Sequence, residues 1–295
     1  MCRGQGQEAG GRGMAAAKDA TTCEELLRDA RAALAVRLAQ SSGALLRDAF
    51  FGDVRADNKQ ARGFDPVTAA DRAAEERMRA MIAEAFPADG ILGEELGAAN
   101  AGAAWQWVLD PIDGTRAFLC GLPGFATLIA LLHEGTPTLG IIHEPLTGLL
   151  LIGNNRACWQ VRDGKAQPAK VRPPLPLQEA LAGTTLPRLY DTPGKRAFLD
   201  ALQKRARHVQ FDADALFYAA VARGRMDVAL DTGLQPHDAA ALIPVVRGAG
   251  GRITDWCGND AVMGGDVIAS SGGALHEALL ELLAETGAAE EASCR

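Results

Sequence analysis

The 295-residue sequence lacks the features that would place it in a membrane or on a secretory route. It contains no run of about 18 apolar residues, so no membrane-spanning helix is expected. Its first 13 residues are rich in Gly, Gln and Arg and contain no apolar segment, which argues against a secretory signal. Its six cysteines form no C-x-x-C pair and no metal-finger spacing. The simplest interpretation is a reduced, cytoplasmic compartment.

An excess of positive charge is also missing, because the formal net charge is −7. Proteins that follow a nucleic-acid backbone need a basic surface, so no nucleic-acid partner is expected. No Gly-x-x-x-x-Gly-Lys-Ser/Thr motif is present, which leaves a nucleotide P-loop unsupported. A small anionic substrate is still compatible with this charge, since bound cations can reverse the local field.

The hydrophobic content of 48% allows a large core, arranged as one domain or two. Capping signals and apolar periodicity predict one long helix from Thr22 to Leu45, a second from Thr68 to Phe86 and a third over 237–249. Three apolar runs between Phe125 and Gly153 alternate with turn signals, which predicts an antiparallel meander. The expected parts are a disordered extension over 1–18 (with Met14 as an alternative start), an α+β half over 19–172, an α/β half over 173–287 and a tail over 288–295.

The most informative segment is Trp107-Val108-Leu109-Asp110-Pro111-Ile112-Asp113-Gly114-Thr115. A short apolar run leads into two carboxylates that flank Pro-Ile, and Gly-Thr follows. This arrangement can end a strand, turn sharply and open a helix. Carboxylate oxygens suit Mg²⁺ and a helix N-terminus suits phosphate, so one turn could hold both. Taken alone, the same residues are better explained by a β-turn without any ligand.

Other acidic residues fall where strands end or helices begin. Glu94 follows a short predicted strand, Asp71 lies in a Thr-x-x-Asp capping box, and Asp238 opens a helix. Each has a purely structural explanation, as a solvated strand end, a helix cap or a favourable partner of the helix dipole. Together with Asp110 and Asp113, they could instead form one site that binds two or three cations and activates water for phosphoryl chemistry.

Four separated motifs resemble the inositol monophosphatase family. Their order and spacing agree over roughly residues 20–285. The resemblance implies a layered α/β sandwich, a Mg²⁺-dependent phosphatase that acts on a small phosphate monoester, and a homodimer. The motifs are Asp65-Pro66-Val67-Thr68-Ala69-Ala70-Asp71, Gly93-Glu94-Glu95, the segment from Trp107 to Thr115, and Asp238-Ala239-Ala240 with Ala249-Gly250-Gly251.

The same resemblance implies a role for each matching residue. Asp71 and Thr115, together with Glu94, would orient the attacking water, and the N–H groups of Gly114 and Thr115 would hold the phosphate. Asp231 and Arg116 would contact the organic part of the substrate. Two or three Mg²⁺ ions would be held by Glu94, Asp110, the Ile112 carbonyl, Asp113 and Asp238.

Within the family, the segment from Gly114 to Pro123 is similar to the histidinol-phosphatase branch, as are Thr184-Thr185 and residues 233–236. The expected substrate is therefore L-histidinol phosphate. An inositol monophosphate, a 3′-phosphonucleotide, and a regulatory binding role for the same fold stay open as alternatives. The chain departs from the usual Arg and Gly pair of this branch at Gln210, Asp212 and Ala213, and from a common aromatic position at His237.

Overall fold

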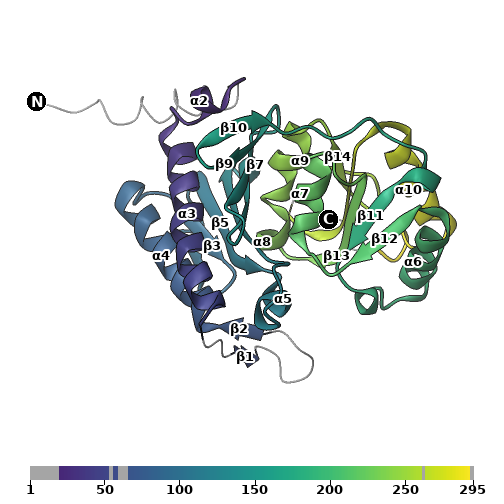
Figure 1. Ribbon diagram of the computed structural model, residues 1–295, viewed down its shortest axis with the longest axis horizontal. Coiled ribbons are helices and arrows are strands. Elements are labelled where there is room, and N and C mark those ends of the chain that lie inside the picture. Colours follow the sequence, from purple (N-terminus) through teal and green to yellow (C-terminus); the bar gives the residue numbers. More distant parts are fainter. Residues whose placement is uncertain (1–19, 53–55, 59–65, 261–262, 293–295) are drawn as a thin grey trace, which may run out of the picture.

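The computed structural model describes residues 20–52, 56–58, 66–260 and 263–292. These residues form alternating layers of helix and sheet (Figure 1). The layered α/β sandwich expected from the sequence is confirmed. The layers are, from one side to the other, α3 (Ala30–Phe50) with α4 (Ala69–Ala85), an eight-stranded sheet, α7 (Ala215–Ala222) with α8 (Pro236–Ala239) and α9 (Leu242–Gly248), a five-stranded sheet, and α6 (Pro193–Arg205) with α10 (Gly273–Glu285).

The eight-stranded sheet has the order β10-β9-β8-β7-β6-β5-β3-β4. The pair of β3 and β5 is parallel, and the other neighbours in this sheet are antiparallel. The predicted meander is β6 to β8. The strands are β3 (Gly90–Gly93), β4 (Gly97–Ala99), β5 (Trp105–Asp113), β6 (Ala126–His133), β7 (Thr136–Glu144), β8 (Leu149–Gly153), β9 (Cys158–Arg162) and β10 (Lys165–Pro168).

The five-stranded sheet has the order β12-β11-β13-β15-β14. β11 pairs in parallel with both β12 and β13, whereas β15 runs antiparallel to β13 and β14. A separate two-stranded ribbon joins β1 (Ala56–Asn58) to β2 (Pro66–Thr68), and β2 contacts the short helix α5 (Thr115–Leu119). The strands of the five-stranded sheet are β11 (Leu181–Thr184), β12 (His208–Phe211), β13 (Val228–Leu234), β14 (Arg252–Asp255) and β15 (Gly265–Ser270).

The side-chain alternation of β5 divides its residues between two hydrophobic cores. Trp107 and Leu109 are buried in the core beneath α3 and α4. Val108 is buried in the other core, between the two sheets, together with residues of α7 and α9. Because successive side chains of a strand point to opposite faces, Asp110 shares the inter-sheet face with Val108. A third core lies between the five-stranded sheet and the outer helices α6 and α10.

Two of the expected long helices are interrupted. The first is split into α2 (Cys23–Leu26) and α3, because the Asp29 carboxylate accepts from the N–H groups of Arg31 and Ala32 and so starts a new helix. The helix expected over 237–249 is split into α8 and α9. Pro244 explains this break, since it has no N–H to donate to the Ala240 carbonyl and its ring crowds that carbonyl.

The cysteines agree only in part with a fully reduced chain. Cys23, Cys120 and Cys158 are free, but Cys257 is disulfide-bonded, which the sequence did not predict. Within the described residues, every helix is too short or too polar to cross a bilayer. The extension expected over 1–18 lies outside the described residues, as do Asp65 of the first motif and residues 293–295 of the expected tail.

Candidate active site

A β-bulge in β5 brings the two aspartates of the central motif to one side of the sheet. Two residues three apart on a regular strand would point to opposite faces. Between Asp110, which pairs with Leu128, and Asp113, which pairs with Ala126, β5 carries one residue more than β6. The extra residue reverses the alternation. Thr127 of β6 fixes the bulge by donating from Oγ1 to the Pro111 carbonyl at 2.8 Å.

Gly114 turns the chain from β5 into α5. Its φ of +89° lies in the left-handed region that favours glycine. A Cβ at this position would lie 2.5 Å from the Gly124 carbonyl oxygen, so a larger residue would displace the neighbouring chain. The Thr115 hydroxyl closes the turn by donating to the Ile112 carbonyl at 2.9 Å. The sequence expectation of a strand, a sharp turn and a helix start is confirmed here.

Asp238 from the other half of the fold joins these two aspartates. One carboxylate oxygen from each of Asp110, Asp113 and Asp238 lies within 4.8 Å of the others. Asp238 reaches this position from α8, where its Oδ2 accepts from the Gln235 N–H at 2.6 Å. Asp113 also connects the halves, since its Oδ2 accepts from the Ala215 N–H at the start of α7, at 2.7 Å. The cluster therefore lies where β5 and α8 meet (Figure 1).

Burial and mutual repulsion raise the pKa of each member of this cluster. The pKa of Asp110 is raised first by burial and then by Glu94, Asp113 and Asp238. The pKa of Asp113 is raised by burial and by neighbouring carboxylates, including Asp238. Burial also raises the pKa of Asp238 to about 6, although His237 opposes the shift. Concentrated negative charge of this kind is stabilised by a bound cation.

The donor set fits a hard divalent cation. Asp110 is 1% exposed, and its buried Oδ1 has no hydrogen-bond partner among the described residues. A buried carboxylate oxygen without a donor is costly unless a ligand satisfies it. Carboxylate oxygens, with the nearby Ile112 carbonyl, are the ligands that Mg²⁺ prefers.

Glu94 lies beside Asp110 on a turn that Glu75 holds in place. The buried Glu75 carboxylate accepts from the N–H groups of Glu95, at 2.8 Å, and Leu96, at 3.3 Å, directly after Glu94. Gly93 leaves the room for it, since a Cβ there would lie 1.9 Å from Glu75 Oε1. Sequence analysis missed Glu75. The available signal was its position one helical turn after Asp71, on the same face of α4.

Asp71 is the acidic member of the capping box that starts α4. Its Oδ2 accepts from the Thr68 N–H at 2.8 Å and from the Thr68 hydroxyl at 2.6 Å. The structural explanation of Asp71 is therefore correct, and the side chain is fully buried. The contact between β2 and α5 places this helix start next to the turn that carries Thr115.

The two residues expected near the substrate's organic part occupy different environments. Asp231 is 3% exposed, and its Oδ1 accepts from the Thr185 N–H at 2.8 Å and from the Thr184 hydroxyl at 3.2 Å. Burial raises the pKa of Asp231 to about 7. Arg116 is half-buried and forms an ion pair with Asp214 at 3.6 Å. Asp214 also raises the pKa of Asp113, so Arg116 lies at the edge of the acidic cluster.

The residues that depart from the family pattern lie close to Asp214 or Asp238 in the sequence. Asp212 is exposed and has a φ of +70°, so an aspartate occupies a left-handed position where the related branch has glycine. Aspartate tolerates this conformation better than most residues do. Gln210 is exposed and contacts His208 at 3.2 Å, and Ala213 is partly buried. His237 lies 3.6 Å from Asp238.

Comparison with known proteins agrees with this geometry. A model of the inositol monophosphatase family matches residues 28–288. A histidinol-phosphatase of Mycobacterium tuberculosis is 36% identical over 254 residues, which cover 85% of this chain and 96% of the relative. A protein named bifunctional phosphatase IMPL2, chloroplastic, from Arabidopsis thaliana is 37% identical over 235 residues. That match covers 78% of this chain but 65% of the plant protein.

A solved structure supports the same assignment. The inositol monophosphatase from Zymomonas mobilis superposes with a TM-score of 0.73 at 33% identity. The match covers 90% of this chain and 100% of that structure. Fold, sequence and the arrangement of the acidic residues thus lead to one conclusion: this chain belongs to the inositol monophosphatase family.

Proposed function

We propose that this chain is a Mg²⁺-dependent phosphomonoesterase whose preferred substrate is L-histidinol phosphate. The observation that supports phosphatase activity most strongly is the cluster of the buried Asp110 with the partly buried Asp113 and Asp238, in which one carboxylate oxygen of each residue lies within 4.8 Å of the others. Every residue that the family resemblance assigns to metal binding is present. This argues against the alternative of an inactive regulatory protein that has kept only the fold.

The metal ligands would be Glu94, Asp110, the Ile112 carbonyl oxygen, Asp113 and Asp238, holding two or three ions. When bound, Mg²⁺ supplies a Lewis acid that neutralises charge on the phosphate and lowers the pKa of water. The chain's own residues do the positioning. Glu75 holds the turn that carries Glu94, and the β5 bulge aims Asp110 and Asp113 at one point.

The remaining residues of the turn would bind phosphate and orient water. The first N–H groups of a helix have no partner within the helix, so those of Gly114 and Thr115 are available to phosphate oxygens. The Thr115 hydroxyl, which donates to the Ile112 carbonyl, still has lone pairs that can accept from water. Asp71 and Glu94 would complete the orientation of that water.

Replacement Thr115→Ala is expected to lower kcat by about 100-fold with little change in KM, because misplaced water reacts slowly while phosphate binding persists. Thr115→Ser is the matched control, since it keeps the hydroxyl and should retain most of the activity. Steady-state phosphate release measures both variants. An unchanged kcat for Thr115→Ala would remove the hydroxyl from the proposed mechanism.

The substrate proposal depends on negative charge near the cluster. L-Histidinol phosphate carries an amine and an imidazole, which a carboxylate can bind, whereas inositol is a neutral polyol. Asp231 provides a buried carboxylate beside Asp214, and Asp212 adds an exposed one. The histidinol-phosphatase from Mycobacterium tuberculosis gives independent support. The similarity to the Zymomonas mobilis inositol monophosphatase keeps inositol monophosphates as the second candidate.

Replacement Asp231→Asn is expected to lower kcat/KM for L-histidinol phosphate by roughly 10- to 100-fold, as for the loss of a hydrogen bond to a charged group. Turnover of a simple aryl phosphate, which lacks the amine, should change much less. The wild type should also prefer L-histidinol phosphate in a panel with inositol 1-phosphate and a 3′-phosphonucleotide. A preference for either competitor by kcat/KM would disprove the histidinol assignment and leave the phosphatase class intact. A cytoplasmic location and a homodimer stay predictions.

A further inference from the structure

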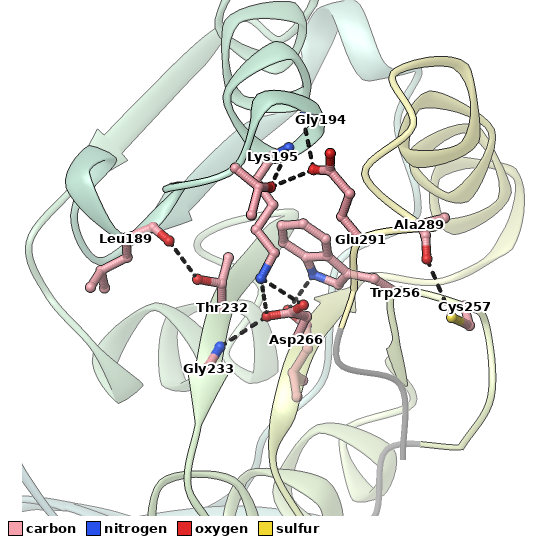
Figure 2. Close-up of polar contacts among 12 residues, drawn as sticks. Leu189, Gly194, Lys195, Thr232, Gly233, Trp256, Cys257, Asp266, Ala289 and Glu291 are labelled. Atoms are coloured by element: carbon pink, nitrogen blue, oxygen red, sulfur yellow. Dashed lines mark hydrogen bonds and ion pairs between the residues drawn. The ribbon is translucent and has the colours of Figure 1, made fainter.

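Figure 2 shows a buried ion pair between Lys195 and Asp266. Trp256, which lies beside the ammonium, belongs to the core between the five-stranded sheet and the outer helices, on the opposite face of that sheet from the core between the two sheets. Lys195 of α6 places its ammonium 2.9 Å from Asp266 Oδ1 and 2.8 Å from Oδ2. Lys195 is 7% exposed and Asp266 is fully buried. Trp256 covers the ammonium, which lies 5.6 Å from the centre of an indole ring. Burying two charges is expensive, and such a pair is often no better for stability than apolar residues of similar volume.

The carboxylate of this pair reaches the backbone of β13 at a second β-bulge. Asp231 pairs with Val267 and Leu234 pairs with Gly265, so β13 carries two residues, Thr232 and Gly233, opposite Asp266 alone. Asp266 Oδ1 accepts from the Gly233 N–H at 2.9 Å. Gly233 has a φ of +72°, so the bulge contains a left-handed backbone conformation that favours glycine.

The bulge determines which way the residues around it face. Ala229 points into the core between the sheets, and the alternation of the strand directs Asp231 to that same side. Leu234 also packs on that core, although a regular strand would direct it to the other face. The bulge therefore lies between Asp231 and the segment that leads through Gln235 to Asp238.

A second contact restrains Thr232, the other residue of the bulge. The Thr232 hydroxyl donates to the Leu189 carbonyl at 3.0 Å, in the segment that leads to the start of α6 (Figure 2). That start is itself held to the C-terminal segment, because Glu291 Oε2 accepts from the Gly194 N–H at 2.8 Å. Lys195 thus connects an anchored helix, through Asp266, to the strand that carries Asp231 and leads to Asp238 on α8.

We infer that Asp266 is a positioning residue, with Lys195 as its counter-ion, and that its hydrogen bond fixes the β13 bulge and thereby holds Asp238 where it can bind metal. The inference rests on the proposed function, since it assigns Asp238 to the Mg²⁺ site. The contact that transmits the effect is the hydrogen bond from the Gly233 N–H to Asp266. The ammonium of Lys195 neutralises the charge of Asp266, so this acceptor can be a buried carboxylate.

The test compares two double variants that both remove the buried charges. In K195M/D266N, the Asn amide oxygen can still accept from the Gly233 N–H. In K195M/D266L, a side chain of similar size offers no acceptor. Isothermal calorimetry with Mg²⁺ alone measures affinity without any substrate. We expect K195M/D266L to bind Mg²⁺ about tenfold more weakly than the wild type, as for partners that orient metal ligands, and K195M/D266N to keep wild-type affinity.

A matched control lies at the other end of β13. Arg172 pairs with the fully buried Asp227, whose Oδ2 accepts from the Leu181 N–H at 2.7 Å. R172M/D227L removes this ion pair and its backbone acceptor, far along the strand from the bulge. It is expected to lower the unfolding temperature and to leave Mg²⁺ affinity unchanged.

The outcomes separate the two proposals. Absence of Mg²⁺ binding by the wild type would contradict the proposed function itself. Where the wild type binds Mg²⁺, equal affinity of the two Lys195 double variants would overturn the inference, because the Gly233 acceptor would then make no difference. A loss of affinity in R172M/D227L matching that in K195M/D266L would also overturn it, since any damage to the sheet would then suffice.

Discussion

Excess EDTA is expected to abolish phosphate release by this chain, and added Mg²⁺ is expected to restore it. The physical reason is the concentration of carboxylates at the end of β5. Asp110, Asp113 and Asp238 repel one another, and burial raises the pKa of each, so the site is built for a cation that is removed by the chelator. Without the cation, no group neutralises the charge of the phosphate or lowers the pKa of the attacking water.

The control for this experiment is EDTA that has been saturated with Mg²⁺ beforehand, which should leave turnover intact and so exclude direct inhibition by the chelator. Undiminished turnover in excess free EDTA would contradict the metal-dependent mechanism. A wild type that binds Mg²⁺ but releases phosphate from no monoester would instead favour the regulatory binding role.

The turn at Asp110–Thr115 could be predicted from sequence because its residues determine the local backbone conformation. Pro111 restricts the backbone, Gly114 permits the left-handed turn, and the apolar residues before Asp110 specify a buried strand. The convergence of Glu94 and Asp238 on this turn is a long-range feature. It followed from the family resemblance and from the general placement of sites at strand ends.

The supporting contacts could not be predicted because they depend on pairing between distant segments. The β5 bulge needs Thr127 to donate to the Pro111 carbonyl, and nothing local marks Thr127 for that task. Glu75 reads as an ordinary charged helix residue until its carboxylate is seen to accept from Glu95 and Leu96. Lys195 likewise reads as a solvated residue near a helix start. In each case the tertiary fold, rather than the local sequence, gives the side chain its partner.

Replacement Asp110→Asn is expected to lower kcat/KM by about 1000-fold, which corresponds to about 4 kcal/mol of transition-state stabilisation. The amide keeps the volume of the side chain but offers Mg²⁺ a neutral oxygen. The matched control is Asp89→Asn, at a buried aspartate that accepts from Arg31 and from the Trp107 indole in the α3–α4 layer. That variant should be less stable yet keep its kcat/KM. Near-normal activity of Asp110→Asn would show that Asp110 is not a metal ligand.

The same variant should be more stable than the wild type when metal is removed, and the difference should depend on pH. The folded-state pKa of Asp110 is raised above its usual value of 3.8, so above about pH 4 the unfolded chain loses this proton first. The free energy of unfolding of the wild type therefore falls as pH rises toward the folded-state pKa, whereas Asn carries no titrating proton.

In EDTA, the excess of the variant's unfolding temperature over that of the wild type should be smallest near pH 4 and should grow with pH. Saturating Mg²⁺ should make the wild type the more stable of the two proteins, because the wild type binds Mg²⁺ more tightly than the variant does. A difference that stays constant from pH 4 to pH 8 would mean that repulsion at Asp110 does not limit the stability of the metal-free protein.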